Sequence, residues 1–229
     1  MATTRYDPAD EIGRGPLSRG AAVAYRMLVL EGMLVLALAP TIVVMLVLDR
    51  DPSNVPFFVL ALLPLAPALV AAVGAMAAWR RSPDLSPARA FVLAYRRDLV
   101  PTLAWAAPAQ LLLAVLAFNL VHLDAVAGAS MLRPVLVVVA GILIVWCGHM
   151  VALTAGFRFR LRDAALIALS QLFAQWRYSL GILSLVLVAA TLVLLFSEFV
   201  LLLFAWVFAA LLAVLARPLT ADVTERFTR

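Results

Sequence analysis

The stretch YSLGILSLVLVAATLVLLFSEFVLLLFAWVFAALLAVLA, residues 178–216, decides the class of fold. At 1.5 Å of rise per residue, a single helix of this length would be about 58 Å long, which is about twice the hydrocarbon thickness of a bilayer. This stretch is almost continuously apolar, and its one charged residue, Glu198, follows Ser197. Serine is a good N-cap, and an acid in the first turn suits the positive end of the helix dipole. We therefore predict two membrane-spanning helices joined by a tight turn at these two residues.

The whole chain has the composition of an integral membrane protein. Of its 229 residues 66% are hydrophobic and 14% are charged, against about 25% charged residues in soluble domains. This composition excludes a soluble domain and a disordered chain, and the single cysteine excludes a disulfide framework. We expect an all-α, polytopic membrane helical bundle with six transmembrane helices in three hairpins. The six apolar stretches are residues 27–48, 55–79, 99–121, 134–156, 178–196 and 199–216.

The basic residues predict how the chain threads through the membrane. All 18 are arginine, and 16 of them lie in segments that share one side of the predicted bundle, whereas only Arg50 and Arg133 lie on the other. Cytoplasmic loops carry an excess of Lys and Arg. We therefore expect a multi-pass protein of the cytoplasmic (inner) membrane with both termini in the cytoplasm. The net charge of +5 is then a topology signal and gives no reason to expect nucleic-acid binding.

The pattern predicts one membrane domain, 1–229, built from repeated hairpin units. Its parts are a stub at 1–23, hairpin one at 24–80, an interfacial helix with hairpin two at 81–156, an interfacial helix with hairpin three at 157–217, and a tail at 218–229. Ala24-Tyr25-Arg26, Ala94-Tyr95-Arg96 and Gln175-Trp176-Arg177 recur at the start of each hairpin. A true threefold repeat is one interpretation, and the general enrichment of aromatic residues and arginine at membrane boundaries is the other.

The two long cytoplasmic connections read as amphipathic helices. The first begins at Ser86-Pro87 and places Ala88, Phe91, Val92, Tyr95 and Leu99 on one face. The second has an apolar face of Leu161, Leu166, Leu169, Leu172, Phe173 and Trp176, with Asp163, Ser170, Gln171, Gln175 and Arg177 facing away. Such helices lie in the interface and turn arginine toward anionic lipid headgroups. Alternatively, they dock a cytoplasmic partner through Arg89, Tyr95, Arg96, Arg97, Arg162, Trp176 and Arg177.

A few polar residues and prolines within the spans form the candidate intramembrane site. Glu31 and His149 lie at similar predicted depths, so a proton-sensitive pair is allowed, although Glu31 could instead have a structural role. Gln110 at mid-span is more typical of a contact between helices than of a substrate ligand. Proline frees a backbone carbonyl in the preceding turn, which predicts helix kinks at Pro40, Pro64, Pro67 and Pro108. Small residues after Pro67 (Ala68, Ala71, Ala72, Gly74, Ala75 and Ala78) predict close helix packing.

Motifs of enzymatic chemistry are missing from the sequence. It has no phosphate-binding glycine loop, no zinc-type spacing and no nucleophile motif, so we expect no catalytic residues, no cofactor and no metal site. Asp163-Ala164-Ala165 faintly resembles the coupling motif of ABC importer permeases. However, Leu169 stands where that motif has glycine, and no Leu-Pro follows.

The order of several short motifs resembles the YesL-like family of bacterial membrane proteins, which has no assigned function. These motifs are Ala24-Tyr25-Arg26, Leu65-Ala66-Pro67-Ala68-Leu69, Trp79-Arg80-Arg81 and the run from Phe91 to Leu99. The chain departs from the family before Pro67, where it has Pro-Leu-Ala in place of Thr-Ile-Gly. The resemblance implies a bacterial protein often encoded beside carbohydrate ABC transporters, and it supplies no catalytic residues.

Two functions remain open from the sequence. The first is an accessory membrane protein that associates with carbohydrate ABC transporter subunits through its cytoplasmic helices. The second is a small-solute transporter or channel-like permease in its own right, acting as a homo-oligomer, with Glu31, His149 and the kinked spans near its pathway.

Overall fold

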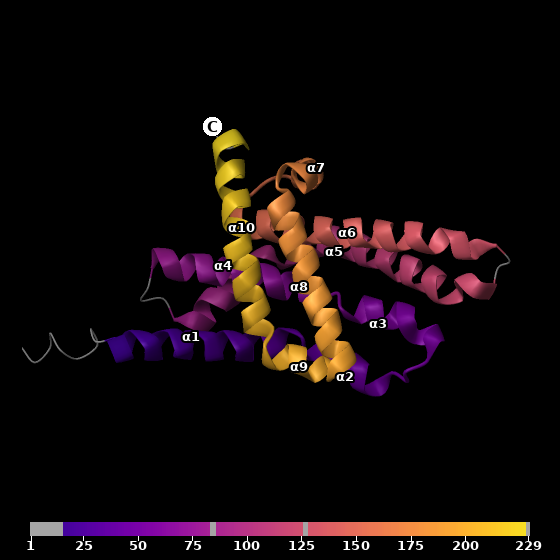
Figure 1. The fold of residues 1–229 in the computed structure, drawn as a ribbon. Coiled ribbons are helices and arrows are strands. Elements are labelled where there is room, and N and C mark those ends of the chain that lie inside the picture. The colour runs from indigo at the N-terminus through magenta and orange to yellow at the C-terminus, as the bar shows by residue number, and fades with distance from the viewer. Residues whose placement is uncertain (1–15, 83–85, 126–127, 228–229) are drawn as a thin grey trace, which may run out of the picture.

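A computed structural model of the chain describes residues 16–82, 86–125 and 128–227, and this part is helical throughout (Figure 1). The first half contains α1 Pro16–Ala37, α2 Ala39–Val47, η2 Pro52–Asn54, α3 Val55–Ala61, α4 Leu65–Arg81 and α5 Pro87–His122. The second half contains η3 Leu123–Ala125, η4 Ala129–Leu132, α6 Arg133–Gly156, α7 Leu161–Ala174, α8 Trp176–Leu195, α9 Glu198–Leu203 and α10 Ala205–Phe227. Predictions made for residues 1–15 lie outside the described residues.

Within the residues that the structure describes, six segments are long and apolar enough to cross a membrane, so the prediction of a six-span membrane protein is confirmed. They are Gly20–Ala37, Pro52–Arg81, Pro87–Ala125, Arg133–Gly156, Trp176–Leu195 and Ala205–Glu225. The predicted helix boundary at Ser197-Glu198 is present, but the short helix α9 separates the last two spans where the sequence predicts a tight turn alone. The Ser197 hydroxyl accepts a hydrogen bond from the Phe199 backbone N–H at 3.2 Å, with Glu198 in the first turn of α9.

Three helix breaks lie within or next to the spans. The break at residues 62–64, between α3 and α4, lies inside the second span, whereas the breaks at Leu38, between α1 and α2, and at Phe204, between α9 and α10, adjoin the ends of the first and last spans. Pro40 lies in the first turn of α2 and Pro64 is the N-cap of α4, so these two prolines stand at breaks, as proline's missing N–H predicts. Pro108 lies inside α5, which continues through it.

The third span begins earlier than the sequence predicts. Helix α5 has 36 residues and is about 54 Å long, and it runs without interruption from Pro87. The residues predicted to form a separate interfacial helix after Ser86 are therefore its first three turns, and that prediction is wrong in this respect. The physical reason is a continuous packed face, since a stripe of buried residues at helical spacing extends through the whole region: Ala90, Ala94, Asp98, Thr102, Trp105 and Ala109.

Helix α4 lies at the centre of the bundle, where it packs against α1, α5, α6 and α10. Its predicted small-residue face is buried, and Ala68, Ala71, Ala72 and Ala75 are fully enclosed. Small side chains let helix backbones approach closely, which supplies the van der Waals contact that holds helices together in lipid. The prediction of close packing after Pro67 is confirmed.

The last two spans cross the third and fourth spans at a steep angle. In Figure 1, α8 and α10 cross α5 and α6 steeply instead of running alongside them. The crossing is close, because a Cβ atom on Gly148 of α6 would lie 2.5 Å from Cδ1 of Ile182 on α8. A Cβ on Gly181 of α8 would likewise lie 2.9 Å from Cδ1 of Leu215 on α10. Both glycines therefore stand where helices touch.

We expect Gly148→Ala to lower the free energy of unfolding by about 1–3 kcal/mol, because overpacking a fitted contact forces neighbouring side chains to move. Gly141→Ala, on the same helix, is the matched control, since a Cβ there meets nothing within 4 Å. Denaturant titration in detergent micelles measures both. Equal stability of the two variants would contradict the close crossing.

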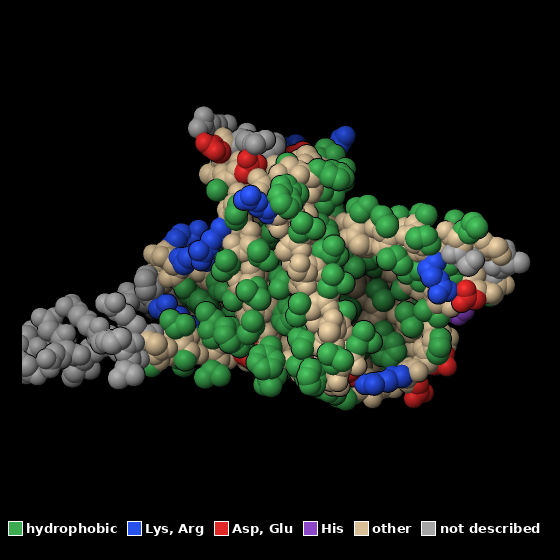
Figure 2. Space-filling view, in the orientation of Figure 1, with side chains coloured by type: hydrophobic (Ala, Val, Ile, Leu, Met, Phe, Trp, Pro, Cys, Tyr) green, Lys and Arg blue, Asp and Glu red, His purple; other side chains and the backbone are tan. Residues whose placement is uncertain are grey.

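Exposed arginines gather at one end of the bundle, which we call the arginine-rich end: the last turn of α4, the first turns of α5, the connection between α6 and α7, and the start of α8. Figure 2 shows hydrophobic side chains over much of the body and charged groups toward its ends. At the arginine-poor end each arginine is paired: Arg50 with Glu198 at 2.5 Å and Arg133 with Asp124 at 2.9 Å. Nearby, hydrogen bonds from Ser53 lower the pKa of the Asp51 carboxyl.

Candidate functional site

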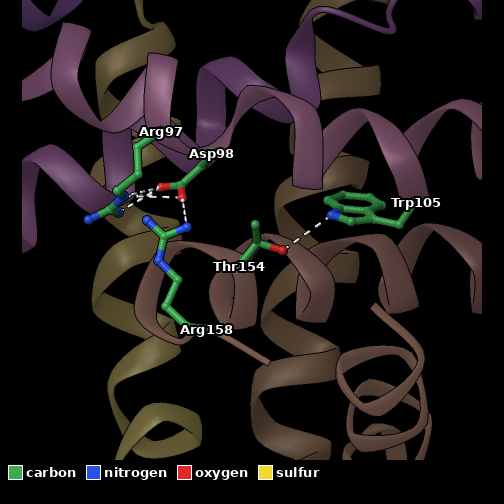
Figure 3. Close-up of polar contacts among 5 residues, drawn as sticks. All are labelled: Arg97, Asp98, Trp105, Thr154 and Arg158. Atoms are coloured by element: carbon green, nitrogen blue, oxygen red, sulfur yellow. Dashed lines mark hydrogen bonds and ion pairs between the residues drawn. The ribbon is translucent and has the colours of Figure 1, made fainter. Parts of the chain in front are cut away.

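A buried carboxylate at the arginine-rich end is the most concentrated charge cluster in the described part of the chain. The side chain of Asp98 is only 2% exposed, and it lies between the guanidinium groups of Arg97 and Arg158 (Figure 3). Nη2 of Arg97 lies 2.6 Å from Oδ2, and Nη1 of Arg158 lies 3.0 Å from Oδ1. Each carboxylate oxygen thus has a charged donor, which is how a buried charge is tolerated.

The cluster ties three parts of the fold together. Asp98 and Arg97 belong to α5, while Arg158 comes from the connection between α6 and α7. Nη2 of Arg97 also lies 3.7 Å from the point where a Cβ on Gly74 of α4 would be. Because two arginines face one carboxylate, the cluster keeps one excess positive charge. Both arginine side chains are about half exposed, so this excess charge is open to an outside anion.

A cavity of about 140 Å³ lies beside the cluster, between α5, α6 and α7. Most of its lining is apolar, and the polar groups on it belong to Trp105, Thr154 and Arg158. The indole N–H of Trp105 donates to the Thr154 hydroxyl at 3.2 Å (Figure 3). The indole N–H of Trp146, whose ring meets that of Trp105 edge-on, donates to the Ala165 carbonyl. These bonds fix the wall of the cavity.

Sequence reasoning missed Asp98, Arg158, Trp105 and Thr154 as site residues. One signal was present, because Asp98 follows the residues Arg96-Arg97 and continues the i, i+4 series from Ala90 and Ala94. The predicted face was instead chosen for its large apolar residues. Val92, on that face, is exposed in the structure. In a membrane helix large apolar side chains can face lipid while small and polar residues pack inside, which reverses the usual interpretation of a helical wheel.

Glu31 meets the start of α10. Its Oε2 accepts a hydrogen bond from the Trp206 backbone N–H at 2.8 Å. The first backbone N–H groups of a helix have no partner within it, and inside a membrane no bulk water replaces one. Glu31 therefore caps α10, the helix that forms the sixth span. Its Oε1 is buried and has no hydrogen-bond partner among the described residues.

Two other polar side chains donate hydrogen bonds to backbone carbonyls near the break in the second span. The Thr41 hydroxyl donates to the Ala61 carbonyl at 2.6 Å, and the Gln110 amide donates to the Val59 carbonyl. The N–H of Leu65, which would reach Ala61 in an unbroken helix, bonds to Leu62 instead. The sequence-based interpretation of Gln110 as a contact between helices agrees with this geometry.

His149 is fully buried on α6, away from the groups just described. Its Nδ1 lies 3.0 Å from the Val145 carbonyl, and its ring meets that of Tyr178 edge-on at 4.8 Å between centroids. The Tyr178 hydroxyl donates to the Gly148 carbonyl, so the residue joins α8 to α6. The structure thus gives Glu31 and His149 different partners: the start of α10 for one, and α6 and α8 for the other.

The residues predicted to dock a partner are mostly exposed. Arg89, Arg96, Arg162 and Arg177 are all on the surface. Trp176 is exposed with the guanidinium of Arg177 5.5 Å from its ring centroid, while Tyr95 is half-buried and stacks on Phe91. Arg97 differs from these arginines because its guanidinium forms an ion pair with the Asp98 carboxylate.

Helix α7 presents two different faces. Ala164, Ile167, Ala168 and Leu172 are buried against the bundle, and Phe173 on the opposite side is 86% exposed. Gln171, predicted to face away, is buried instead, and its Nε2 donates to Asp222 of α10 at 3.2 Å. The exposed side carries the large residues of the predicted apolar face: Leu161, Leu166, Leu169 and Phe173.

No protein-family model, no curated protein and no solved structure matches the chain. The resemblance to the YesL-like family therefore gains no support from these comparisons. What stands is a helical membrane protein with six spans. Among the residues that the structure describes, no group of three or more His, Cys, Asp or Glu side chains is arranged to hold a metal ion.

Proposed function

We propose that this protein is an accessory component of the bacterial cytoplasmic membrane, which associates with a carbohydrate uptake system through its arginine-rich end. The observation that carries the proposal is the exposed set of arginines on α5, α7 and α8, with aromatic side chains beside them. Arginine and aromatic residues are enriched in protein interfaces. The carbohydrate system itself comes from the family resemblance alone.

The polar groups within the spans support an accessory role over transport. Glu31, Thr41 and Gln110 each hydrogen-bond to the backbone of a neighbouring helix, and His149 bonds within α6 and packs on α8. A transport pathway needs polar side chains that are free to meet a solute, whereas each of these directs at least one polar atom to a backbone group.

A specific observation favours the transporter as the second candidate. Discontinuous helices line the substrate sites of many transporters, and here the broken pair α1 and α2 lies next to the broken pair α3 and α4. The unpartnered Oε1 of Glu31 would be the proton-binding atom of such a site.

Affinity purification of the tagged protein from native membranes tests the proposal. We expect near-stoichiometric recovery of carbohydrate ABC transporter subunits, and loss of most of that recovery in Arg89→Gln/Arg96→Gln. The matched control is Arg50→Gln/Arg133→Gln, which removes two arginines from the opposite end and should keep the partner. Recovery of the protein alone, combined with proton-coupled solute uptake in liposomes, would favour the transporter and reject the accessory role.

A further inference from the structure

The cavity beside Asp98 has the form of a site for an amphiphile. One side is a guanidinium, Arg158, whose side chain is 57% exposed, and the remainder is largely aliphatic and aromatic. The cavity lies where α6 ends and α7 begins, at the boundary between the apolar spans and the arginine-rich end. A ligand that fits it carries an anionic group next to an apolar chain.

We propose that this cavity binds one anionic phospholipid, with its phosphate on Arg158 and the upper part of one acyl chain in the space between α5 and α7. This inference does not depend on the accessory function.

Charge supports the headgroup position. Arg158 pairs with Asp98 through Nη1, and a guanidinium has five N–H donors in a planar fork that matches phosphate. The neighbouring Arg160 is exposed and adds positive charge. A phosphate here neutralises the excess charge that Asp98 leaves uncompensated.

The walls support the acyl-chain position. Pro101 and Ala104 from α5 face Leu161 and Ala164 from α7 across the cavity, with Leu153 and Phe157 contributed by α6 and its end. The exposed leucines of α7 continue the apolar surface outward from Leu161. The volume, about 140 Å³, holds only a segment of chain, so the rest of the lipid extends into the bilayer.

Native mass spectrometry of the full-length protein, titrated with phosphatidylglycerol or phosphatidylcholine of the same chains, tests the site. We expect one phosphatidylglycerol molecule to bind about tenfold more tightly than phosphatidylcholine, which corresponds to about 1.4 kcal/mol. Both lipids have a phosphate, but phosphatidylcholine also carries a choline cation, which the exposed Arg158 and Arg160 repel, whereas phosphatidylglycerol has a net negative charge. Ala104→Phe fills the cavity and should weaken this binding by about tenfold or more. Ala107→Phe, exposed on the same helix and outside the cavity, should leave it unchanged.

Arg158→Gln should also abolish the preference for phosphatidylglycerol, whereas Arg160→Gln should retain most of it. Since Arg158→Gln also removes a partner of Asp98, the Ala104 variant decides the question if the arginine variant fails to fold. Equal binding of the two lipids to the wild-type protein, or equal binding by the Ala104 and Ala107 variants, would overturn the proposal.

A second measurement tests whether the acyl chain of the lipid enters the cavity. Trp105 lines the cavity and is only 3% exposed, so acyl chains in bulk lipid do not reach it. The emission of Trp105 is the difference between the fluorescence of the wild-type protein and that of Trp105→Phe. Phosphatidylglycerol with brominated chains should quench this emission, and Ala104→Phe should reduce the quenching. Unchanged Trp105 fluorescence with the brominated lipid would exclude an acyl chain from the cavity.

Discussion

The variant Arg97→Met/Arg158→Met is expected to lower the free energy of unfolding by about 3–5 kcal/mol, the largest effect among the substitutions considered. It leaves the carboxylate of Asp98 buried at 2% exposure without a charged donor. Stranding one member of a buried ion pair costs about this much, because a charge removed from water has lost its compensation. Denaturant titration in detergent micelles gives the value.

Two controls separate this cause from a general loss of arginine. Arg89→Met/Arg96→Met removes two exposed arginines from the same helix and should change stability by less than about 1 kcal/mol. Adding Asp98→Asn to the first variant removes the stranded charge and should restore at least about 1 kcal/mol. A triple variant no more stable than the double would show that the buried charge is not the source of the loss.

Glu31→Ala is expected to cost about 2 kcal/mol or more, since it leaves the Trp206 N–H at the start of α10 without an acceptor inside the membrane. Glu31→Gln should cost less than about 1 kcal/mol, because the amide oxygen can accept the same hydrogen bond. Unfolding titrations of the two variants provide the comparison.

The same pair of variants distinguishes a helix cap from a proton carrier. A cap needs an acceptor and no titratable group, so Glu31→Gln should keep whatever activity the wild-type protein has. If Glu31 carries protons, Glu31→Gln should be as inactive as Glu31→Ala while remaining stable, and that result would support the transporter.

Local sequence information was sufficient to predict the membrane-spanning segments. Each is a continuous apolar run, and the helix boundary at Ser197 is set by a cap and an acid in neighbouring positions, so both could be predicted from short windows. The small-residue face of α4 could be predicted for the same reason, because its spacing lies within one helix.

The contacts that build the candidate site could not be predicted in this way. Glu31 and Trp206 are 175 positions apart, and Asp98 meets Arg158 only because α5 and α6 pack together. The face of α5 was only partly predicted: Phe91 is buried, but Val92 is exposed. Lipid accepts large apolar side chains, so the small and polar residues Ala94, Asp98 and Thr102 occupy the packed face. Hydrophobicity alone therefore identifies a membrane helix without saying which side faces its neighbours.

The cytoplasmic position of the arginine-rich end is central to the proposed docking role, and labelling with a membrane-impermeant thiol reagent tests it most directly. Cys147 is first replaced by alanine, and single cysteines are then introduced as Met131→Cys at the arginine-poor end and Ser170→Cys on α7, both exposed positions. We expect Met131→Cys to be labelled on intact cells from which any outer membrane has been removed, and Ser170→Cys only after permeabilisation. Labelling of Ser170→Cys on those intact cells, with Met131→Cys protected, would place the arginine-rich end outside and contradict the proposed function.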